Sequence, residues 1–318
     1  MSEIVINAQN LSKNFYNFDS RLPFIKRFLK RNQITIRAVQ DISFTIKRGS
    51  IVGFIGSNGA GKSTTIKMLT GTLYPSSGKL EVNGEIPFER SINFRKKISI
   101  VVGNKLQLFQ DVSAMDYFQL IGTLYEVEPA ILQERIQELS NLLNVKDQLY
   151  QQVRTLSLGQ KMKMEFIAAS LTSPEILFLD EPTIGLDIQS KKDIRTFLKK
   201  MNEECHTTII LTSHDMDDIS SVCDELIVID KGKIILQESM DVILSKFSDF
   251  KYLKIKMTLD LVPELCSVKG VVVISQTKSE CILKIPRDFV FETLESINKL
   301  VDIEDFEISD SMPFLVCY

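Results

Sequence analysis

The sequence predicts an α/β protein built on a mainly parallel β-sheet, with an antiparallel β subdomain, a helical insertion and a small C-terminal α+β domain. Three observations favour this architecture. An apolar strand at residues 51–55 leads into a glycine-rich turn and a helix, as in sheets that are buried on both faces. Strand-like and helix-like segments alternate from residue 176 to residue 229, which is typical of parallel sheets. After about residue 247 the order of elements changes to βαββαβ.

The first part of the chain is expected to be rich in strand. Apolar residues alternate at residues 4–8 and 34–46, and the second segment leads to a turn at Lys47-Arg48-Gly49. Between the two segments we expect a basic, amphipathic insertion at about residues 18–37. Its basic residues are interleaved with apolar ones and are Arg21, Lys26, Arg27, Lys30, Arg31 and Arg37.

Strand is also expected at residues 79–103, with Asn83-Gly84 as the turn of a hairpin. A helical subdomain follows at about residues 105–172, because apolar residues recur three and four positions apart between Ile131 and Leu143. The parallel sheet then resumes and closes at a hairpin at Lys231-Gly232-Lys233. Its strands are predicted at residues 176–179, 207–211 and 225–229, and its helices at residues 190–202 and 215–222.

These elements divide the chain into a main domain at residues 1–240 and an accessory domain at residues 247–318. The order of elements in the accessory domain predicts a ferredoxin-like fold. Its strands are expected at residues 252–257, 271–276, 280–285 and 303–308, and its helices at residues 259–266 and 289–300. The accessory domain carries no recognisable chemical motif.

The composition is that of a folded cytosolic protein. With 318 residues, 44% hydrophobic and 25% charged, and a net charge of −3, the chain is neither disordered nor a globally basic nucleic-acid binder. No apolar run approaches the roughly 18 residues that a membrane-spanning helix needs, and the N-terminus does not resemble a secretion signal. The five cysteines are widely spaced and form no CxxC motif, which favours free thiols over a disulfide framework or a zinc site.

The glycine-rich turn carries the clearest chemical motif. Residues 56–63, Gly-Ser-Asn-Gly-Ala-Gly-Lys-Ser, fit the phosphate-binding pattern GxxxxGK[ST] between an apolar strand and a helix. We expect backbone N–H groups to surround nucleotide phosphates, Lys62 to reach the β- and γ-phosphates, and the hydroxyl of Ser63 to hold Mg²⁺. The predicted contacts from this loop are Gly56, Ser57, Asn58, Gly59, Ala60, Gly61, Lys62, Ser63 and Thr64.

Two carboxylates follow a second apolar strand. Asp180 comes directly after residues 176–179, and Glu181 follows it. We expect Asp180 to act on Mg²⁺ directly or through a water molecule, and Glu181 to orient and deprotonate an attacking water. Such a pair alone is often only a solvated strand end, but the phosphate-binding loop earlier in the chain favours the catalytic interpretation.

Together these motifs resemble the ATP-binding cassette (ABC) family across residues 4 to about 240. Leu156-Ser157-Leu158-Gly159-Gln160, at the start of a predicted helix, is similar to the signature sequence of the family. Residues 181–187 resemble its Walker B and D-loop continuation, and residues 212–215 resemble its switch histidine after a strand. The resemblance implies a P-loop ATPase with ATP and Mg²⁺ as cofactors.

The resemblance also implies that the active site is shared between two cassettes. In the family the signature, here Ser157, Gly159 and Gln160, caps the γ-phosphate of ATP bound to the opposite cassette, so that two identical or paralogous cassettes close head to tail around two ATP molecules. The residues support an anion site, because a helix start here offers the hydroxyl of Ser157, the N–H groups of residues 157–160 and the positive end of the helix dipole. Ser157 is also expected to be the N-cap of that helix.

Other roles rest on the resemblance alone. It implies that His214 contacts the γ-phosphate and orients Glu181 and water, so that Lys62, Glu181 and His214 are the expected catalytic residues. It implies that Asp187 bridges to the phosphate loop of the partner cassette, and that Phe15 stacks on adenine. Tyr16 competes with Phe15 for the adenine contact, and either aromatic ring could simply pack.

The sequence departs from the family pattern at two positions. The family usually has glutamine at the end of the strand after the first hairpin, where the chain has Asn104. Asparagine keeps the amide but is one methylene shorter, so we expect a contact to Mg²⁺ bridged by water. Gln107 and Gln110 are weaker candidates for this contact, because they lie several residues past the strand end. Leu158 replaces the middle glycine of the signature, but Ser157 and Gly159 remain, so we expect function to survive.

The leading functional hypothesis is the ATP-hydrolysing subunit of an ABC exporter that acts on separate transmembrane permease subunits. Residues 71–78 and 211–218 are similar to cassettes of the drug, antibiotic or polysaccharide exporter group. Cargo could also be a peptide, and nucleic acid is not expected as a partner. The alternative is a soluble ABC ATPase of DNA repair or translation, but these usually carry long coiled-coil insertions or tandem cassettes. A P-loop kinase or GTPase would have no reason to carry the signature.

Under the leading hypothesis, the chain is peripheral at the cytoplasmic face of the cell membrane. Residues 105–117 are expected to form a groove for a helix of the membrane subunit. About half of its apolar residues could instead be core; they are Leu106, Leu108, Phe109, Met115 and Tyr117. The basic insertion either contacts an anionic membrane surface or is a solvated loop.

Overall fold

The computed structural model describes residues 3–18, 33–248, 250–256, 271–276, 280–286, 293 and 305–309. The chain divides into two units, Met1–Gln237 and Glu238–Tyr318, and each is described by itself. The core of the predicted basic insertion, residues 19–32, lies outside the described residues. Within the described residues, no helix is both long enough and apolar enough to cross a membrane.

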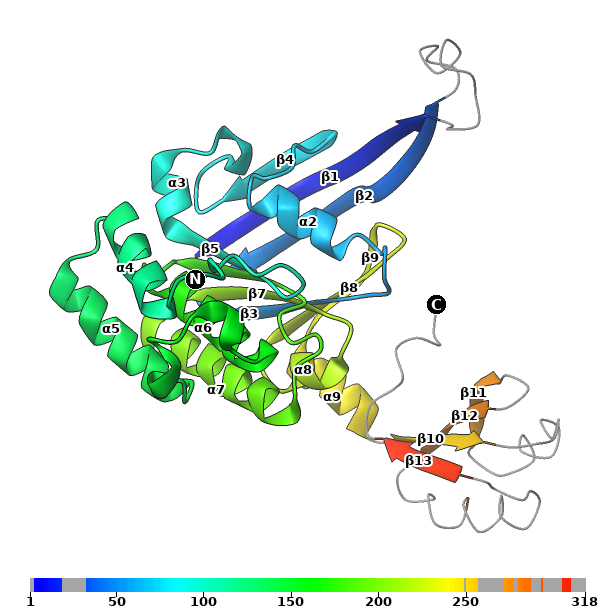
Figure 1. The fold of residues 1–318 in the computed structure, drawn as a ribbon. Helices are drawn as coiled ribbons and strands as arrows, with labels where there is room; N and C mark the ends of the chain where they lie inside the picture. Colours follow the sequence, from blue (N-terminus) through cyan, green and yellow to red (C-terminus); the bar gives the residue numbers. More distant parts are fainter. Residues whose placement is uncertain are drawn as a thin grey trace. The chain divides into compact units, whose positions relative to one another are not determined.

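The N-terminal strands form an antiparallel sheet of three strands in the order β2-β1-β4 (Figure 1). These strands are β1 (Ile4–Phe18), β2 (Gln33–Lys47) and β4 (Ser77–Val82). The pairing of β1 with β2 continues to Phe18, opposite Gln33. The boundaries of the predicted insertion, 18–37, are therefore too wide, because Phe18 and residues 33–37 are paired strand residues.

The second sheet of this unit has six strands in the order β5-β6-β7-β3-β8-β9, and its first five strands are parallel. The strands are β3 (Ile51–Ile55), β5 (Ile98–Val102), β6 (Ile176–Asp180), β7 (Thr208–Ser213), β8 (Glu225–Asp230) and β9 (Lys233–Ser239). In the register, Asp180 is the partner of Thr212 and of Val102, and Ile55 is the partner of Ser213. The carboxyl ends of β3, β5, β6 and β7 therefore meet at one edge, where α/β sheets bind ligands.

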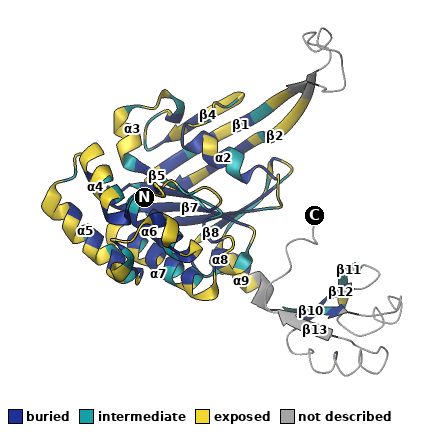
Figure 2. Cartoon of the chain, viewed as in Figure 1, coloured by how far each residue is buried: buried dark blue, intermediate teal, exposed yellow. Residues whose placement is uncertain are grey.

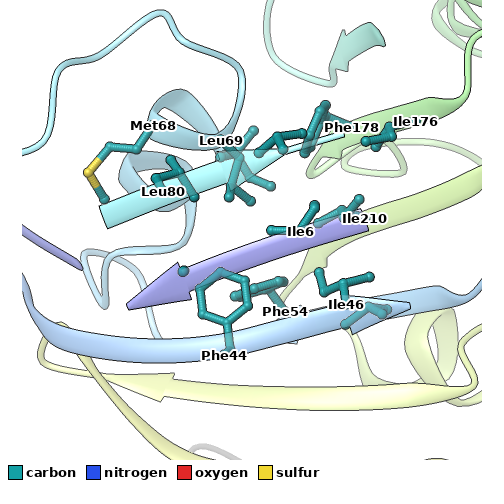
Figure 3. Packing of buried hydrophobic residues seen from close by; sticks show 14 of the residues in the cluster. Ile6, Phe44, Ile46, Phe54, Met68, Leu69, Leu80, Ile176, Phe178 and Ile210 are labelled. Carbon is teal, nitrogen blue, oxygen red and sulfur yellow. The ribbon is translucent and has the colours of Figure 1, made fainter. Parts of the chain in front are cut away.

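The main core lies between the two sheets and includes residues of α2 (Lys62–Leu69). Figure 3 shows Phe44 and Leu80 from the antiparallel sheet, Met68 from α2, and Phe54 and Phe178 from the parallel sheet in one cluster. The rings of Phe44 and Phe54 pack edge to face with their centroids 5.4 Å apart. Burial of each such side chain stabilises the fold by about 1.5–3 kcal/mol, which fixes α2 and the loop before it.

The other face of the parallel sheet is covered by α6 (Leu158–Ser170), α7 (Ile188–Cys205) and α8 (Met216–Ser220). Because both faces are covered, the parallel strands are almost wholly buried (Figure 2). Gly53 of β3 faces α8, and a Cβ atom there would lie 2.8 Å from the side chain of Ile219. The glycine thus allows α8 to pack close to the sheet.

The predicted helical subdomain is present. It contains α4 (Ala114–Leu124), α5 (Pro129–Leu142), two short 3₁₀ helices (Lys146–Gln148 and Val153–Thr155) and α6. A capping box between Ser113 and Asp116 starts α4, and such a box satisfies two N–H groups that the helix leaves free.

The prediction of strand throughout residues 79–103 is wrong. The turn at Asn83-Gly84 forms, with both residues at positive φ, but only the isolated bridge from Val82 to Glu85 follows it. A 3₁₀ helix (Pro87–Glu89) and α3 (Ile92–Lys97) then lead to β5. Pro87 has no N–H group for a strand ladder, and the hydroxyl of Ser91 accepts the N–H of Phe94 at 2.9 Å, which starts α3.

The second unit contains α9 (Met240–Ser248), which was not predicted, and an antiparallel sheet in the order β11-β12-β10-β13. Its strands are β10 (Phe250–Lys256), β11 (Val272–Gln276), β12 (Glu280–Pro286) and β13 (Asp305–Ser309). β12 lies between β10 and β11, and β10 lies between β12 and β13, which is the split βαβ pattern of a ferredoxin-like sheet. The two predicted helices lie outside the described residues, apart from Thr293, which is helical.

Candidate active site

The loop between β3 and α2 is shaped by two glycines. A Cβ atom at Gly56 would lie 2.1 Å from the carbonyl oxygen of Ile229, so no side chain fits there. Gly61 has a φ of +115° and precedes the first residue of α2, a conformation that favours glycine. A glycine-rich loop that ends in a helix N-terminus presents backbone N–H groups and the positive helix dipole to an anion.

Lys62 is buried at the start of α2, with 5% of its surface exposed. Its Nζ donates hydrogen bonds to the carbonyl oxygens of Gly56, at 2.6 Å, and Ser57, at 3.3 Å. It also lies 3.5 Å from Oε1 of Glu181. The ammonium group is therefore held between the loop and the end of β6, where it can neutralise phosphate charge.

Asp180, at the end of β6, joins two hydroxyl groups. Its Oδ1 accepts a hydrogen bond from Ser63 Oγ at 2.9 Å and another from Thr212 Oγ1 at 2.7 Å. Ser63 and Asp180 were predicted as metal ligands, and the structure brings them together. The hydroxyl and carboxylate oxygens are the hard donors that Mg²⁺ prefers, and Mg²⁺ usually completes its shell with water and substrate phosphates; the pair therefore fits this ion.

Glu181 has a strained backbone, with a φ of +48°. A non-glycine residue in the left-handed region is uncommon, and such strain costs about 1–3 kcal/mol and is concentrated at functional sites. The N–H of Glu181 bonds to both the hydroxyl oxygen and the carbonyl oxygen of Thr212, at 3.0 and 3.1 Å. Its Oε2 lies 3.1 Å from Nδ1 of His214, so the expected base and the expected switch histidine touch.

Thr212 lies in the motif at residues 212–215, but the sequence assigned it no role. It is fully buried in β7, and its hydroxyl contacts both Asp180 and Glu181. The only signal in the sequence is its place at the end of a strand that precedes His214. We identify Thr212 as a positioning residue for both carboxylates.

Asn104 follows β5 at the same edge of the sheet. The preceding residue, Gly103, donates its N–H to the carbonyl oxygen of Asp180 at 2.9 Å, and a Cβ atom there would lie 1.9 Å from the carbonyl oxygen of Glu181. This close approach needs a glycine, a role that sequence reasoning missed, and it places exposed Asn104 beside the end of β6. The side-chain amide of Gln107, the alternative to Asn104, donates a hydrogen bond to the carbonyl oxygen of Ile100 at 2.9 Å.

The signature-like segment begins α6. Ser157 is the N-cap as expected, and a capping box uses two N–H groups: Gln160 donates to Ser157 Oγ at 3.2 Å, and Ser157 donates to Gln160 Oε1 at 2.9 Å. The expectation that residues 157–160 all offer N–H groups to an anion is therefore wrong. The capping bonds occupy the N–H groups of Ser157 and Gln160, and only those of Leu158 and Gly159 are left. The serine hydroxyl still has its own hydrogen to donate.

Gly159 and Asp187 pack against each other. A Cβ atom at Gly159 would lie 2.2 Å from Ser190 Oγ and 3.1 Å from Asp187 Oδ2, so the glycine is needed within the chain as well. Asp187 is the N-cap of α7 and accepts hydrogen bonds from the N–H and the hydroxyl of Ser190, at 2.9 and 2.7 Å. These bonds lower the pKa of Asp187, which keeps an exposed anion at the start of α7.

Charged groups connect α7 to the turn that carries His214. Lys191 Nζ bonds to Asp215 Oδ2 at 2.7 Å; burial raises the pKa of Asp215, but this bond and a backbone N–H outweigh burial and lower it. Asp218 is 1% exposed, accepts a bond from Arg195 Nε at 2.9 Å and is also bonded by the hydroxyl of Thr183. No sequence motif predicted this network, which spans α7, α8 and the segment after Glu181.

The two candidate adenine contacts lie on neighbouring residues of β1. Phe15 is 40% exposed and Tyr16 is 61% exposed. Adjacent strand residues face opposite sides, so one face of β1 carries Phe15 and the other carries Tyr16. Lys13 Nζ lies 5.4 Å from the centre of the Phe15 ring.

A groove lies where the first residues of β5 meet α3, α4 and the second half of α6. Its lining comes from several elements and includes Arg90, Arg95, Gln107, Tyr117, Tyr125 and Glu165. Of the residues predicted to form a groove, 105–117, only Gln107 and Tyr117 line it. Leu108 and Met115 are buried, whereas Phe109 is 57% exposed.

Comparisons with known proteins agree with this geometry. Residues 39–184 match the family model described as ABC transporter. The chain is 32% identical over 216 residues to the ABC transporter ATP-binding protein NatA of Bacillus subtilis, a span of 68% of the chain and 87% of NatA. It is 34% identical over 197 residues to the linearmycin resistance ATP-binding protein LnrL of the same organism, covering 62% of the chain and 63% of LnrL.

A solved structure shows the same fold. The chain matches the dimeric structure of the ATP-binding cassette MJ0796, in a post-hydrolysis state bound to ADP and Pi, with a TM-score of 0.62 and 20% identity. The match covers 74% of this chain and 98% of that one.

Proposed function

Because the chain belongs to the ABC transporter family as an ATP-binding subunit and ATPase, we propose that it hydrolyses ATP to drive an exporter whose membrane-spanning subunits are separate chains. The observation that carries the hydrolytic part is the contact between Glu181 and His214, 3.1 Å apart at the carboxyl edge of the sheet. A carboxylate held by a histidine beside a phosphate-binding loop is suited to water activation.

Each residue at this edge has a defined task in the proposal. The loop from Gly56 to Lys62 binds the phosphates, and Ser63 with Asp180 would hold Mg²⁺, which withdraws negative charge from the phosphates when it is bound. Glu181 accepts the proton of the attacking water. His214 holds the Glu181 carboxylate in place and presents its ring toward the γ-phosphate.

The proposal includes a head-to-tail dimer with composite sites. Ser157, Leu158 and Gly159 offer a hydroxyl and two N–H groups at the start of α6, which suit an anion. Asp187 lies against Gly159, so the D-loop and the signature present one continuous surface to a second cassette. The related fold of MJ0796, solved as a dimer, supports this arrangement.

The groove supports the proposed membrane partner. Arg90 and Arg95 give it a basic side, and Tyr117 and Tyr125 give it an aromatic side, which suits a short cytosolic helix that carries an acidic residue. The name of LnrL, a linearmycin resistance protein, supports export, with an antibiotic or a related compound as cargo. The chain would then lie at the cytoplasmic face of the membrane, held there by the permease.

The hydrolytic role is tested by Glu181→Gln. The amide has the shape of the carboxylate but cannot accept the proton of water, so we expect Mg²⁺-dependent ATP turnover to fall by about 10²–10⁴-fold while ATP binding persists. Glu175→Gln is the control, because Glu175 bonds to Arg48 and Asn83 before the start of β6, at the opposite edge of the sheet. Undiminished turnover in Glu181→Gln would remove Glu181 from the base role.

A further inference from the structure

Glu165 is a buried carboxylate in the middle of α6 that the proposed mechanism does not use. It is 4% exposed and lies eight residues after Ser157, about 12 Å along the helix. Its Oε1 accepts hydrogen bonds from two consecutive backbone N–H groups, those of Gln107 and of Leu108, the second at 2.8 Å. One side-chain oxygen therefore holds two peptide units of a different segment.

The segment that Glu165 holds is the loop that follows Asn104. At one end of this loop, Gly103 bonds to the carbonyl oxygen of Asp180. At the other end, Glu165 holds Gln107 and Leu108, and the Gln107 side chain bonds back to β5. Asn104 thus lies on a short loop that is fixed to the end of β6 on one side and to α6 on the other.

Glu165 also faces the groove, with Gln107 and Tyr117 beside it. Burial raises the pKa of Glu165, and the two backbone N–H groups act in the opposite direction without cancelling the effect. The pKa of Tyr117 is raised by burial and by the negative charge of Glu165. The other charged or titratable groups that line the groove are Arg90, Arg95 and Tyr125.

We propose that Glu165 is a positioning residue that ties the signature helix α6 to the loop carrying Asn104, so that a change at the groove or at the signature moves Asn104. This inference rests on the proposed function and on the sequence-based expectation that Asn104 contacts Mg²⁺ through a water molecule. Glu165 touches neither phosphate nor metal, and its effect passes through the two N–H groups that it holds.

The test compares Glu165→Gln, Glu165→Ala and wild type by ATPase activity at varied Mg²⁺. A misplacement of about 1 Å can reduce turnover by about 10²-fold, so Glu165→Ala should lower kcat by one to two orders of magnitude and raise the Mg²⁺ concentration for half-maximal rate. Glu165→Gln keeps an oxygen that accepts both N–H groups, and should restore both quantities to within about threefold of wild type. Failure of the glutamine variant to restore them, or an unchanged Mg²⁺ dependence in the alanine variant, overturns the inference.

Non-additivity gives a second readout. Asn104→Ala should reproduce the Mg²⁺ shift, and the double variant with Glu165→Ala should be no worse than the more severe single variant, because both changes act on one unit. Independent, additive losses would contradict the inference. Glu175→Gln serves as the control for a lost hydrogen-bonded carboxylate, and its Mg²⁺ dependence should match wild type.

Amide hydrogen exchange separates this inference from the proposed function. In Glu165→Ala, exchange should rise at residues 104–109 and stay unchanged at residues 56–63, whether or not the protein hydrolyses ATP. Uniformly faster exchange would show a general loss of stability and would overturn the inference. Wild-type protein with no Mg²⁺-dependent ATPase would instead overturn the proposed function.

Discussion

At the scale of single residues, the site depends on how one hydroxyl holds two carboxylates. Thr212 donates to Asp180 and accepts from the N–H of Glu181, and it is fully buried. The strained φ of Glu181 needs such support from its surroundings. Thr212 therefore sets the positions of the proposed metal ligand, Asp180, and of the proposed base, Glu181, at once.

Thr212→Val should test this role. Valine has the shape of threonine but no hydroxyl, so Asp180 loses one hydrogen bond and Glu181 loses one of two acceptors. We expect a loss of about 1–3 kcal/mol in the free energy of unfolding and a fall in kcat of about tenfold or more, measured by urea denaturation and steady-state ATPase. Thr212→Ser keeps the hydroxyl and should regain most of the activity; equal loss in both variants would contradict the role.

We expect Glu165 and Glu175 to contribute to the free energy of unfolding with opposite dependences on pH. Burial raises the pKa of Glu165 above its ordinary value of 4.5, so its contribution to stability is full at low pH and is lost as pH rises through the raised pKa. Burial also pushes the pKa of Glu175 upward, but bonds from Arg48, Asn83 and Lys97 outweigh burial and hold it below 4.5. Its contribution is full above pH 4.5 and is lost as pH falls.

Denaturation from about pH 2 to pH 8 checks both signs, because the change for Glu175 falls below its ordinary pKa and the change for Glu165 falls above it. Relative to wild type, Glu165→Gln should gain stability as pH rises from 4 and then reach a plateau, because the amide carries no charge to bury. Relative to wild type, Glu175→Gln should lose stability as pH rises through the lowered pKa of Glu175 toward 4.5, and the difference should then stay constant, since the variant lacks the ionised partner of Arg48. Parallel profiles for the two variants would contradict the assignments.

Local motifs were enough to select Lys62, Ser63, Asp180, Glu181 and His214, and the structure brings these side chains together. Their roles remain predictions. Sequence motifs did not predict the roles of Thr212, Gly103 and Glu165. Each of these residues acts on residues that lie far away in the sequence and come close only through strand register or helix packing. Functional residues that lie in short continuous motifs could be predicted from the sequence, whereas residues that support them from other helices and strands could not.

At the scale of elements, a charge network holds α7 against the turn before α8. Asp218 bonds to Arg195 and Thr183, and Lys191 bonds to Asp215, the residue after His214. The backbone next to His214 is thus tied to α7, the helix that begins after Asp187. We expect a change at Asp187 to reach His214 through this contact.

Asp218→Asn should loosen that contact. Loss of one partner of a buried ion pair costs about 3–5 kcal/mol, and hydrogen exchange should rise at residues 213–216. Asp193→Asn breaks another buried pair, in which Lys163 Nζ lies 2.5 Å from Asp193, and serves as the control. It should cost similar stability without a change at residues 213–216, and equal exchange there in both variants would argue against a specific link.

Hydrophobic periodicity predicted the alternating strands and helices after residue 176 well, since the middle residues of these strands, Ile176–Leu179, Ile209–Leu211 and Leu226–Ile229, are apolar and buried. It failed at residues 79–103, where α3 is only six residues long and depends on the cap at Ser91. The same alternation predicted strand from residue 34, close to the start of β2 at Gln33, whereas the run of basic residues extended the predicted insertion too far, to residue 37.

At the scale of the whole molecule, the order of elements predicted the two sheets, and the family match and the related cassette fold agree with that fold class. Strand order within the sheets was not readable, because it depends on long-range pairing. The register places Val102, Asp180 and Ser213 at one edge, and this juxtaposition makes a site from separate motifs. In the proposed dimer, the signature that completes each site comes from the second chain.

The central claim, a head-to-tail dimer with composite sites, is tested most directly by complementation. Lys62→Ala removes the phosphate-binding lysine, and Ser157→Arg blocks the signature, so each variant alone should have almost no ATPase activity. In a mixed dimer, one site combines the intact loop of one chain with the intact signature of the other. The account predicts that mixing restores Mg²⁺-dependent ATPase well above the sum of the separate variants; a mixture no more active than that sum would contradict it.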